Sequence, residues 1–103
     1  MTRPKEVVFS PEAETQIIAL YDYLAAHASP KIAETYTNAI VERCEQLREM
    51  PLVGVARDDV RRGMRTIFFR KRVVLAYSVA AKAVTVLAIF YGGQDYETLL
   101  RED

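Results

Sequence analysis

Histidine and cysteine are almost missing from this sequence, which contains only His27 and Cys44. A lone cysteine cannot form an internal disulfide, and neither residue has the Cys/His neighbours of a metal site. The two also fall in different predicted helices, with no partner pattern that indicates a nucleophilic triad. We therefore expect no cofactor, no metal and no catalytic residues, and a reducing compartment such as the cytoplasm.

Net charge and long apolar runs are absent as well. Fourteen basic and fourteen acidic residues cancel, so the whole molecule has no bulk attraction for nucleic acid or for an anionic membrane. No apolar run approaches the roughly 20 residues that span a bilayer. The N-terminal segment MTRPKEVVFS lacks the apolar stretch of a signal peptide. The sequence predicts a soluble, cytoplasmic protein with no membrane partner and no sequence-specific nucleic-acid partner.

The chain does have enough apolar material for one core. It is 103 residues long and 50% hydrophobic, and two independent cores would each be too small to bury enough surface. We therefore expect a single domain over residues 1–103. Its charge is uneven, because residues 51–103 carry nine basic and six acidic groups. Most of the excess comes from cations that face only Asp58 and Asp59 in the same stretch: Arg57, Arg61, Arg62, Arg65, Arg70, Lys71 and Arg72.

Two Ser-Pro pairs mark the starts of two helices. Ser10 and Ser29 can each accept a backbone hydrogen bond as N-cap, and the proline that follows suits the first helical turn. Apolar residues then recur every three or four positions, which predicts helices over residues 11 to about 27 and 30 to about 50. Their short connection makes an antiparallel hairpin with both apolar stripes free to cover one layer.

The hydrophobic period changes to two after the hairpin. It predicts strands over residues 64–69, 72–79 and 83–91, which tight connections join into an antiparallel meander. The last of these strands is apolar on both faces, as a central strand is. Three shorter elements complete the chain: a β-prone run at residues 7–9, a surface loop over residues 51–62, and a C-terminal helix over residues 96–101 whose leucines dock on the sheet.

These elements define an α+β fold of the order β-α-α-β-β-β. It has an N-terminal strand, an antiparallel helical hairpin packed on an antiparallel β-sheet, and a short C-terminal helix. Over residues 7 to about 100 the sequence resembles the ParE toxins of the RelE/ParE superfamily of type II toxin–antitoxin modules. The segments that carry the resemblance are Ser10-Pro11-Glu12-Ala13, Tyr21-Asp22-Tyr23-Leu24, Ala33-Glu34-Thr35-Tyr36, Met50-Pro51 through Gly54, Gly63-Met64-Arg65, RVVLAYSV from Arg72, and VTVLAIFYGGQD from Val84.

The resemblance implies a function. ParE-like toxins are neutralised by a ParD-like antitoxin in a toxin–antitoxin hetero-oligomer, and they inhibit DNA gyrase by protein binding rather than by catalysis. The RelE branch implies an alternative, a ribosome-dependent mRNA endonuclease that would use Arg61, Arg65 and Tyr91 here. Relatives commonly carry histidine where Tyr91 stands, so no base that titrates near neutral pH is present there. A third reading is an inactive relative that retains only antitoxin binding.

The arginine group is the candidate binding surface, because guanidinium forks pair with carboxylates or phosphates in fixed geometry. A solvated loop and hairpin turn is the plain alternative. The pattern places Arg65 on the open sheet face beside Ile67 and Phe69, either as a binding residue or as an ordinary surface arginine. Tyr91 either reaches a ligand from the end of its strand or packs under the terminal helix. The predicted target- or antitoxin-binding residues are Arg57, Arg61, Arg62, Arg65, Arg70, Arg72 and Tyr91.

The lone histidine and the lone cysteine receive structural roles. His27 lies near the end of the first helix, where a cation interacts favourably with the helix dipole. Cys44 lies on the apolar stripe of the second helix and is expected to be a small core residue.

Overall fold

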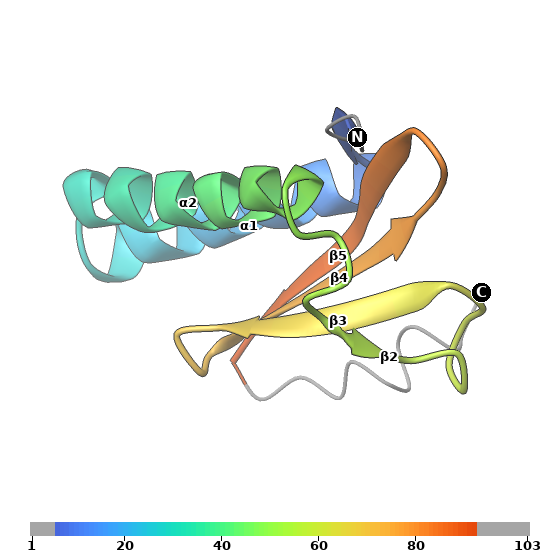
Figure 1. Cartoon of the computed structure of the whole chain (residues 1–103). Coiled ribbons are helices and arrows are strands. Elements are labelled where there is room, and N and C mark those ends of the chain that lie inside the picture. The colour runs from blue at the N-terminus through green and yellow to red at the C-terminus, as the bar shows by residue number, and fades with distance from the viewer. Residues whose placement is uncertain (1–5, 93–103) are drawn as a thin grey trace.

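The computed structural model describes residues 6–92 as a helical hairpin lying against a five-stranded sheet (Figure 1). The predicted α+β class and the predicted order of the elements are confirmed. The predicted C-terminal helix over residues 96–101 lies outside the described residues. The elements are β1 (Glu6–Phe9), α1 (Pro11–His27), α2 (Pro30–Glu45), a 3-10 helix η1 (Gln46–Arg48), β2 (Val55–Ala56), β3 (Met64–Phe69), β4 (Val73–Val79) and β5 (Ala83–Tyr91).

Both helices begin where the Ser-Pro pairs predict. The Ser10 hydroxyl accepts a hydrogen bond from the Ala13 amide at 3.1 Å, and the Ser29 hydroxyl accepts one from the Ile32 amide at 3.1 Å. The end of the second helix differs from the prediction. α2 stops at Glu45 and the chain tightens into η1 before the proline, as helix C-termini commonly do. Within residues 6–92, no helix combines the length and apolarity needed to cross a membrane.

The sheet order is β1-β5-β4-β3-β2. Strands β3, β4 and β5 form the predicted antiparallel meander. β1 adds in parallel to β5, so the strand with two apolar faces is flanked on both sides. The predicted surface loop over residues 51–62 contains a short strand that the sequence did not indicate, because Val55 and Ala56 pair with β3 as strand β2. Two residues are too few to show an alternating pattern, and only the neighbouring strand holds them extended.

The hairpin covers one face of the sheet (Figure 1). Apolar side chains of α1, α2, η1 and that face form the main core, in which Ile40, Leu75 and Tyr77 are fully buried. A smaller cluster lies on the opposite face of the strands: Met64, Val74, Ala76, Ala88 and Phe90. The sheet therefore has apolar residues on both sides, while the helices within residues 6–92 lie on one side.

Tyr77 fixes the segment between η1 and β2 from inside the core. Its hydroxyl accepts a hydrogen bond from the Gly54 amide at 2.8 Å and donates one to the Pro51 carbonyl at 2.9 Å. A Cβ on Gly54 would lie 2.6 Å from that hydroxyl, so only glycine allows this approach. Burial raises the Tyr77 pKa, while the Gly54 hydrogen bond and Arg65 oppose the rise. The hydroxyl therefore stays protonated and can both donate and accept.

The β3–β4 turn is strained. Arg70 and Lys71 have φ values of 52° and 64°, in the left-handed region, and the Arg72 amide donates to the Phe69 carbonyl at 3.2 Å across the turn. Residues with a side chain rarely adopt this conformation, and tight hairpins normally place Asn or Gly there. Strain of this kind is often found at binding sites.

Replacing Tyr77 with phenylalanine tests the contact to the segment before β2. The substitution keeps the ring but leaves a buried Gly54 amide and the Pro51 carbonyl without their partner, which costs about 1–3 kcal/mol. Urea unfolding should show that loss. Tyr23→Phe on α1, where the ring is half exposed, should change the free energy of unfolding by less than about 0.5 kcal/mol. Equal effects of the two substitutions would contradict the assigned role.

Replacing Lys71 with glycine tests the strain in the β3–β4 turn. Glycine adopts positive φ without steric cost, so the free energy of unfolding should rise by about 0.5–1 kcal/mol after the entropy of the unfolded chain is included. The control is Lys82→Gly in the β4–β5 turn. Lys82 is not among the described residues with positive φ, so that substitution should bring no gain. A Lys71→Gly protein that unfolds at lower urea concentration would show that the turn is not strained.

Candidate functional site

The structure divides the predicted arginine surface into parts with different surroundings. The Arg57 guanidinium forms a two-pronged ion pair with Asp59, with both N–O distances at 3.1 Å, and its side chain is only 16% exposed. Asp58 accepts a hydrogen bond from the Gly63 amide at 2.8 Å, which fixes the loop before β3. Arg61 and Arg62 are exposed in that loop. Arg57 therefore stabilises its own loop.

The prediction that Arg65 projects from the open sheet face is wrong. Arg65 pairs across the strands with Tyr77, so it shares the face that the helices cover. Its guanidinium donates to the Gly54 carbonyl at 2.7 Å and to the Leu52 carbonyl at 3.2 Å. Both alternating sets of β3 side chains contain large apolar residues, so the sequence pattern could not indicate which set faces the hairpin.

Three cations stay together at the tip of the β3–β4 hairpin, and we call Arg70, Lys71 and Arg72 the basic turn. All three are exposed, and among residues 6–92 no carboxylate forms a salt bridge with them. Together with Gly92 they line a hollow of about 450 Å³. The Arg70 guanidinium carbon lies 4.9 Å from the centre of the Phe69 ring and 5.6 Å from that of Tyr36. Contact with the rings attracts the guanidinium group and orients it over the ring faces.

A row of aromatic rings leads from the basic turn to the end of α1. We call these residues the aromatic row: Phe69, Tyr36, Tyr91, Tyr23 and His27. Neighbouring ring centres lie 5.8 Å apart for the first pair, then 6.1, 6.2 and 4.2 Å. His27 stacks on Tyr23 and its Nδ1 donates to the Tyr23 carbonyl at 2.9 Å, a contact with the last turn of the helix.

Sequence reasoning found Tyr91 but missed the tyrosines of the helices. Tyr36 falls on the apolar stripe of α2 and is indistinguishable there from a core residue. Tyr23 and His27 are four residues apart on α1, and this spacing is the one signal that could have revealed their stacking. The contact of both helices with β5 is tertiary and is not visible in the sequence.

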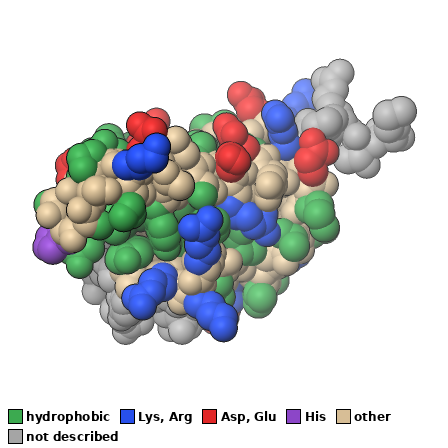
Figure 2. Space-filling model, turned by 90° about the vertical axis from the view of Figure 1, so that its left-hand side faces the viewer, with side chains coloured by type: hydrophobic (Ala, Val, Ile, Leu, Met, Phe, Trp, Pro, Cys, Tyr) green, Lys and Arg blue, Asp and Glu red, His purple; other side chains and the backbone are tan. Residues whose placement is uncertain are grey.

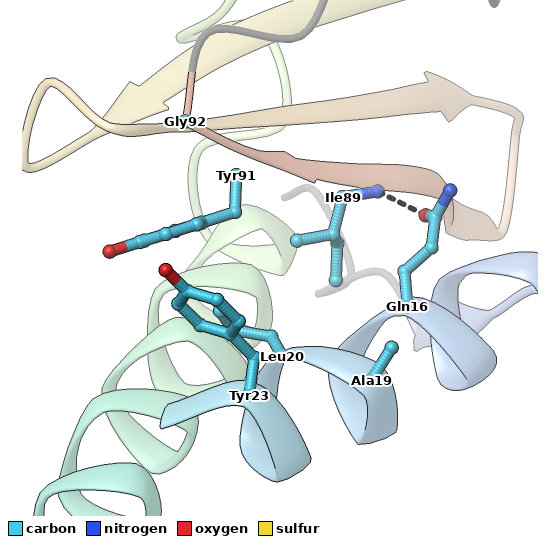
Figure 3. A pocket seen from close by; sticks show the side chains of 7 residues that line it. All are labelled: Gln16, Ala19, Leu20, Tyr23, Ile89, Tyr91 and Gly92. Atoms are coloured by element: carbon cyan, nitrogen blue, oxygen red, sulfur yellow. Dashed lines mark hydrogen bonds between the residues drawn. The ribbon is translucent and has the colours of Figure 1, made fainter. Parts of the chain in front are cut away.

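A groove of about 490 Å³ opens beside the aromatic row, between α1 and β5. Figure 3 shows Tyr23 and Tyr91 projecting toward each other from these two elements. At the other end the Gln16 side-chain oxygen accepts a hydrogen bond from the Ile89 amide at 2.6 Å. Gly92 lines both this groove and the hollow of the basic turn, so the two are adjacent. The lining residues are Gln16, Ala19, Leu20, Tyr23, Ile89, Tyr91 and Gly92.

This end of the molecule presents exposed cations and aromatic rings, and one of the rings carries a buried hydroxyl. The Tyr36 hydroxyl is buried and has no hydrogen-bond partner among residues 6–92. Burial and then the neighbouring Tyr91 raise the pKa of Tyr36, while Arg70 and Arg72 oppose the rise. Tyr36 is therefore neutral near pH 7 and is a poor general base. No group of three or more His, Cys, Asp or Glu side chains that could hold a metal occurs within residues 6–92.

The single thiol lies away from this end, in the core as predicted. Cys44 is fully buried, and burial raises its pKa from 9.0 to about 12. We expect no reaction with dithiobis(nitrobenzoate) at pH 8 in the native state, because the thiolate is the reactive form and is scarce. Reaction should appear in urea over the unfolding transition. Rapid modification of the native protein would contradict the burial.

Comparison with known proteins agrees with this architecture. The family model of the ParE toxin of the type II toxin–antitoxin system parDE matches residues 7–96. A solved structure of the chromosomal ParDE TA system from P. aeruginosa shares the fold with a TM-score of 0.75 at 21% identity, over 86% of this chain and 97% of that chain. No curated protein sequence matches the chain. The chain belongs to the ParE toxin family of type II toxin–antitoxin systems.

Proposed function

We propose that this protein is the toxin of a cytoplasmic toxin–antitoxin module, that a ParD-like antitoxin neutralises it, and that the free toxin inhibits DNA gyrase by binding it. The observation that carries the proposal is the family match over residues 7–96. The toxin acts here as a stoichiometric inhibitor without a cofactor. It forms a higher-order hetero-oligomer with its antitoxin.

The basic turn and its surroundings support the antitoxin part of the proposal. The guanidinium groups of Arg70 and Arg72 are exposed and have no salt bridge to a carboxylate among the described residues, so they are suited to pair with carboxylates of an acidic peptide segment. The adjacent groove offers apolar walls for a side chain of the same segment. Arg70, Arg72 and Tyr91 form the centre of this proposed surface, with Arg61 and Arg62 as a second margin. Arg57 and Arg65 would contribute only by giving up their present contacts.

No observation favours the endonuclease alternative. The residues proposed for this activity are not assembled in one site. Arg65 pairs across the strands with Tyr77, which pairs with Val86. Tyr91 pairs with Val73, which pairs with Phe69. The two sets of paired residues are four positions apart, which corresponds to roughly 13 Å along a strand. Arg65 also directs its guanidinium to backbone carbonyls rather than into a site.

The cellular target is tested with the purified chain. Gyrase assayed with relaxed DNA should lose supercoiling activity and accumulate cleaved DNA when the toxin is added. Translating ribosomes assayed in parallel should show no mRNA cleavage. Ribosome-dependent cleavage without gyrase inhibition would establish the endonuclease instead, and neither effect would indicate a module that only binds its antitoxin.

A charge reversal tests the antitoxin surface. Arg72→Glu should weaken binding of the antitoxin encoded by the neighbouring gene about tenfold or more, because a charge-assisted hydrogen bond becomes a repulsion. Isothermal titration measures the change. Lys82→Glu, in the exposed turn at the other end of β4, is the matched control and should leave affinity within about twofold. Equal loss in both variants would remove the basic turn from the interface.

A further inference from the structure

The aromatic row and the basic turn form one continuous surface that anion pairing alone does not explain. A surface for carboxylates needs guanidinium and ammonium groups, and the basic turn supplies these. It does not need ring faces next to the charges. Here five rings follow one another from Phe69 to His27 at centre spacings of 4.2–6.2 Å.

The lower part of this face carries cations. Figure 2 shows Lys and Arg side chains there with hydrophobic side chains between them, while Asp and Glu side chains lie along the upper margin, where further Lys and Arg side chains stand beside them. The overall neutrality of the chain therefore conceals a locally cationic surface. Within the described chain, the acidic residues nearest in sequence to the basic turn are Asp58 and Asp59. Both are engaged in their own loop, with Gly63 and Arg57.

The rings and cations of this surface differ in their exposure and in their neighbours. Phe69 and Tyr36 are partly buried and lie beneath the Arg70 guanidinium, so they orient a charge rather than offer free faces. Tyr23 is 50% exposed and faces Tyr91 across the groove (Figure 3). Lys71 and Arg72 line the adjacent hollow. Ring faces beside a groove, followed directly by three cations, are the arrangement that binds bases and phosphates of an unpaired strand.

We propose that the aromatic row and the basic turn bind single-stranded nucleic acid without sequence preference, with bases stacked at Tyr23 and Tyr91 and phosphates held by Arg70, Lys71 and Arg72. The proposal does not depend on gyrase being the target. The strained turn fits it, because the two left-handed residues present their side chains at the tip of the hairpin. DNA and RNA offer the same bases and phosphates to this surface, and the test distinguishes them.

The test measures fluorescence anisotropy of labelled oligothymidylate and oligouridylate of ten nucleotides with the full chain. Both should bind at low salt, and log affinity against log salt concentration should fall with a slope of about −2 for three phosphate contacts. A base-paired DNA decamer should bind more weakly, because its bases cannot stack on the tyrosines. A preference for one of the two single strands would identify it as the natural class.

Two pairs of variants separate charge from stacking. Lys71→Ala should reduce the magnitude of the salt slope by about 0.7, and Lys82→Ala in the opposite turn should not change it. Tyr23→Ala should weaken binding roughly 5- to 150-fold, while Ile18→Ala, at an exposed apolar position of the same helix, should have little effect. Circular dichroism confirms that each variant is folded.

Several results would overturn the proposal. They are the absence of binding to either strand at 20 mM salt, equal effects of Lys71→Ala and Lys82→Ala, and binding that is insensitive to Tyr23→Ala. Equal binding of a ten-residue polyglutamate would likewise show a general anion surface. None of these outcomes bears on gyrase inhibition by the same preparation, so failure of this inference is distinguishable from failure of the proposed function.

Discussion

Each helix carries its apolar residues on one stripe, and the helical hairpin is stable because the sheet removes these stripes from water. Ala13 of α1 and Ala33 of α2 are fully buried in the main core. Aliphatic residues and Tyr77 of the facing strands fill the interior, whereas Tyr23 and Tyr91 contact each other toward the ends of α1 and β5. The groove lies at that end, where the tyrosines of the two layers meet. The packing of the hairpin on the sheet therefore determines where the groove lies.

Local signals in the sequence were sufficient for most of the fold. A hydroxyl followed by proline determines a helix start within two residues, and a change of hydrophobic period from four to two marks the passage from hairpin to meander. The parallel partner of β5 could not be read in this way, because the run at residues 7–9 fits either edge of a sheet. Strand β2 was missed because its extended shape depends on backbone partners in β3.

The candidate site was less predictable than the fold, and the arginines show why. Arg57, Arg65 and Arg70 look alike in the sequence, yet one pairs with a carboxylate, one donates to backbone carbonyls and one lies over aromatic rings. Each outcome depends on which neighbour the tertiary fold supplies. A cluster of like charges in a sequence therefore identifies a region, and the partners of each side chain decide which part of the region is available to a ligand.

The pairing of the first strand with the last has a consequence for synthesis in the cell. The Ser10 hydroxyl, which begins α1, donates to the Leu87 carbonyl 77 positions further along the chain, and β1 finds its register only on β5. A nascent chain on the ribosome therefore holds β1 unpaired until the residues of β5 have emerged. Closure of the sheet is a late event, and contacts this distant in sequence form slowly. The complete sheet thus exists only after β5 is available to pair with β1.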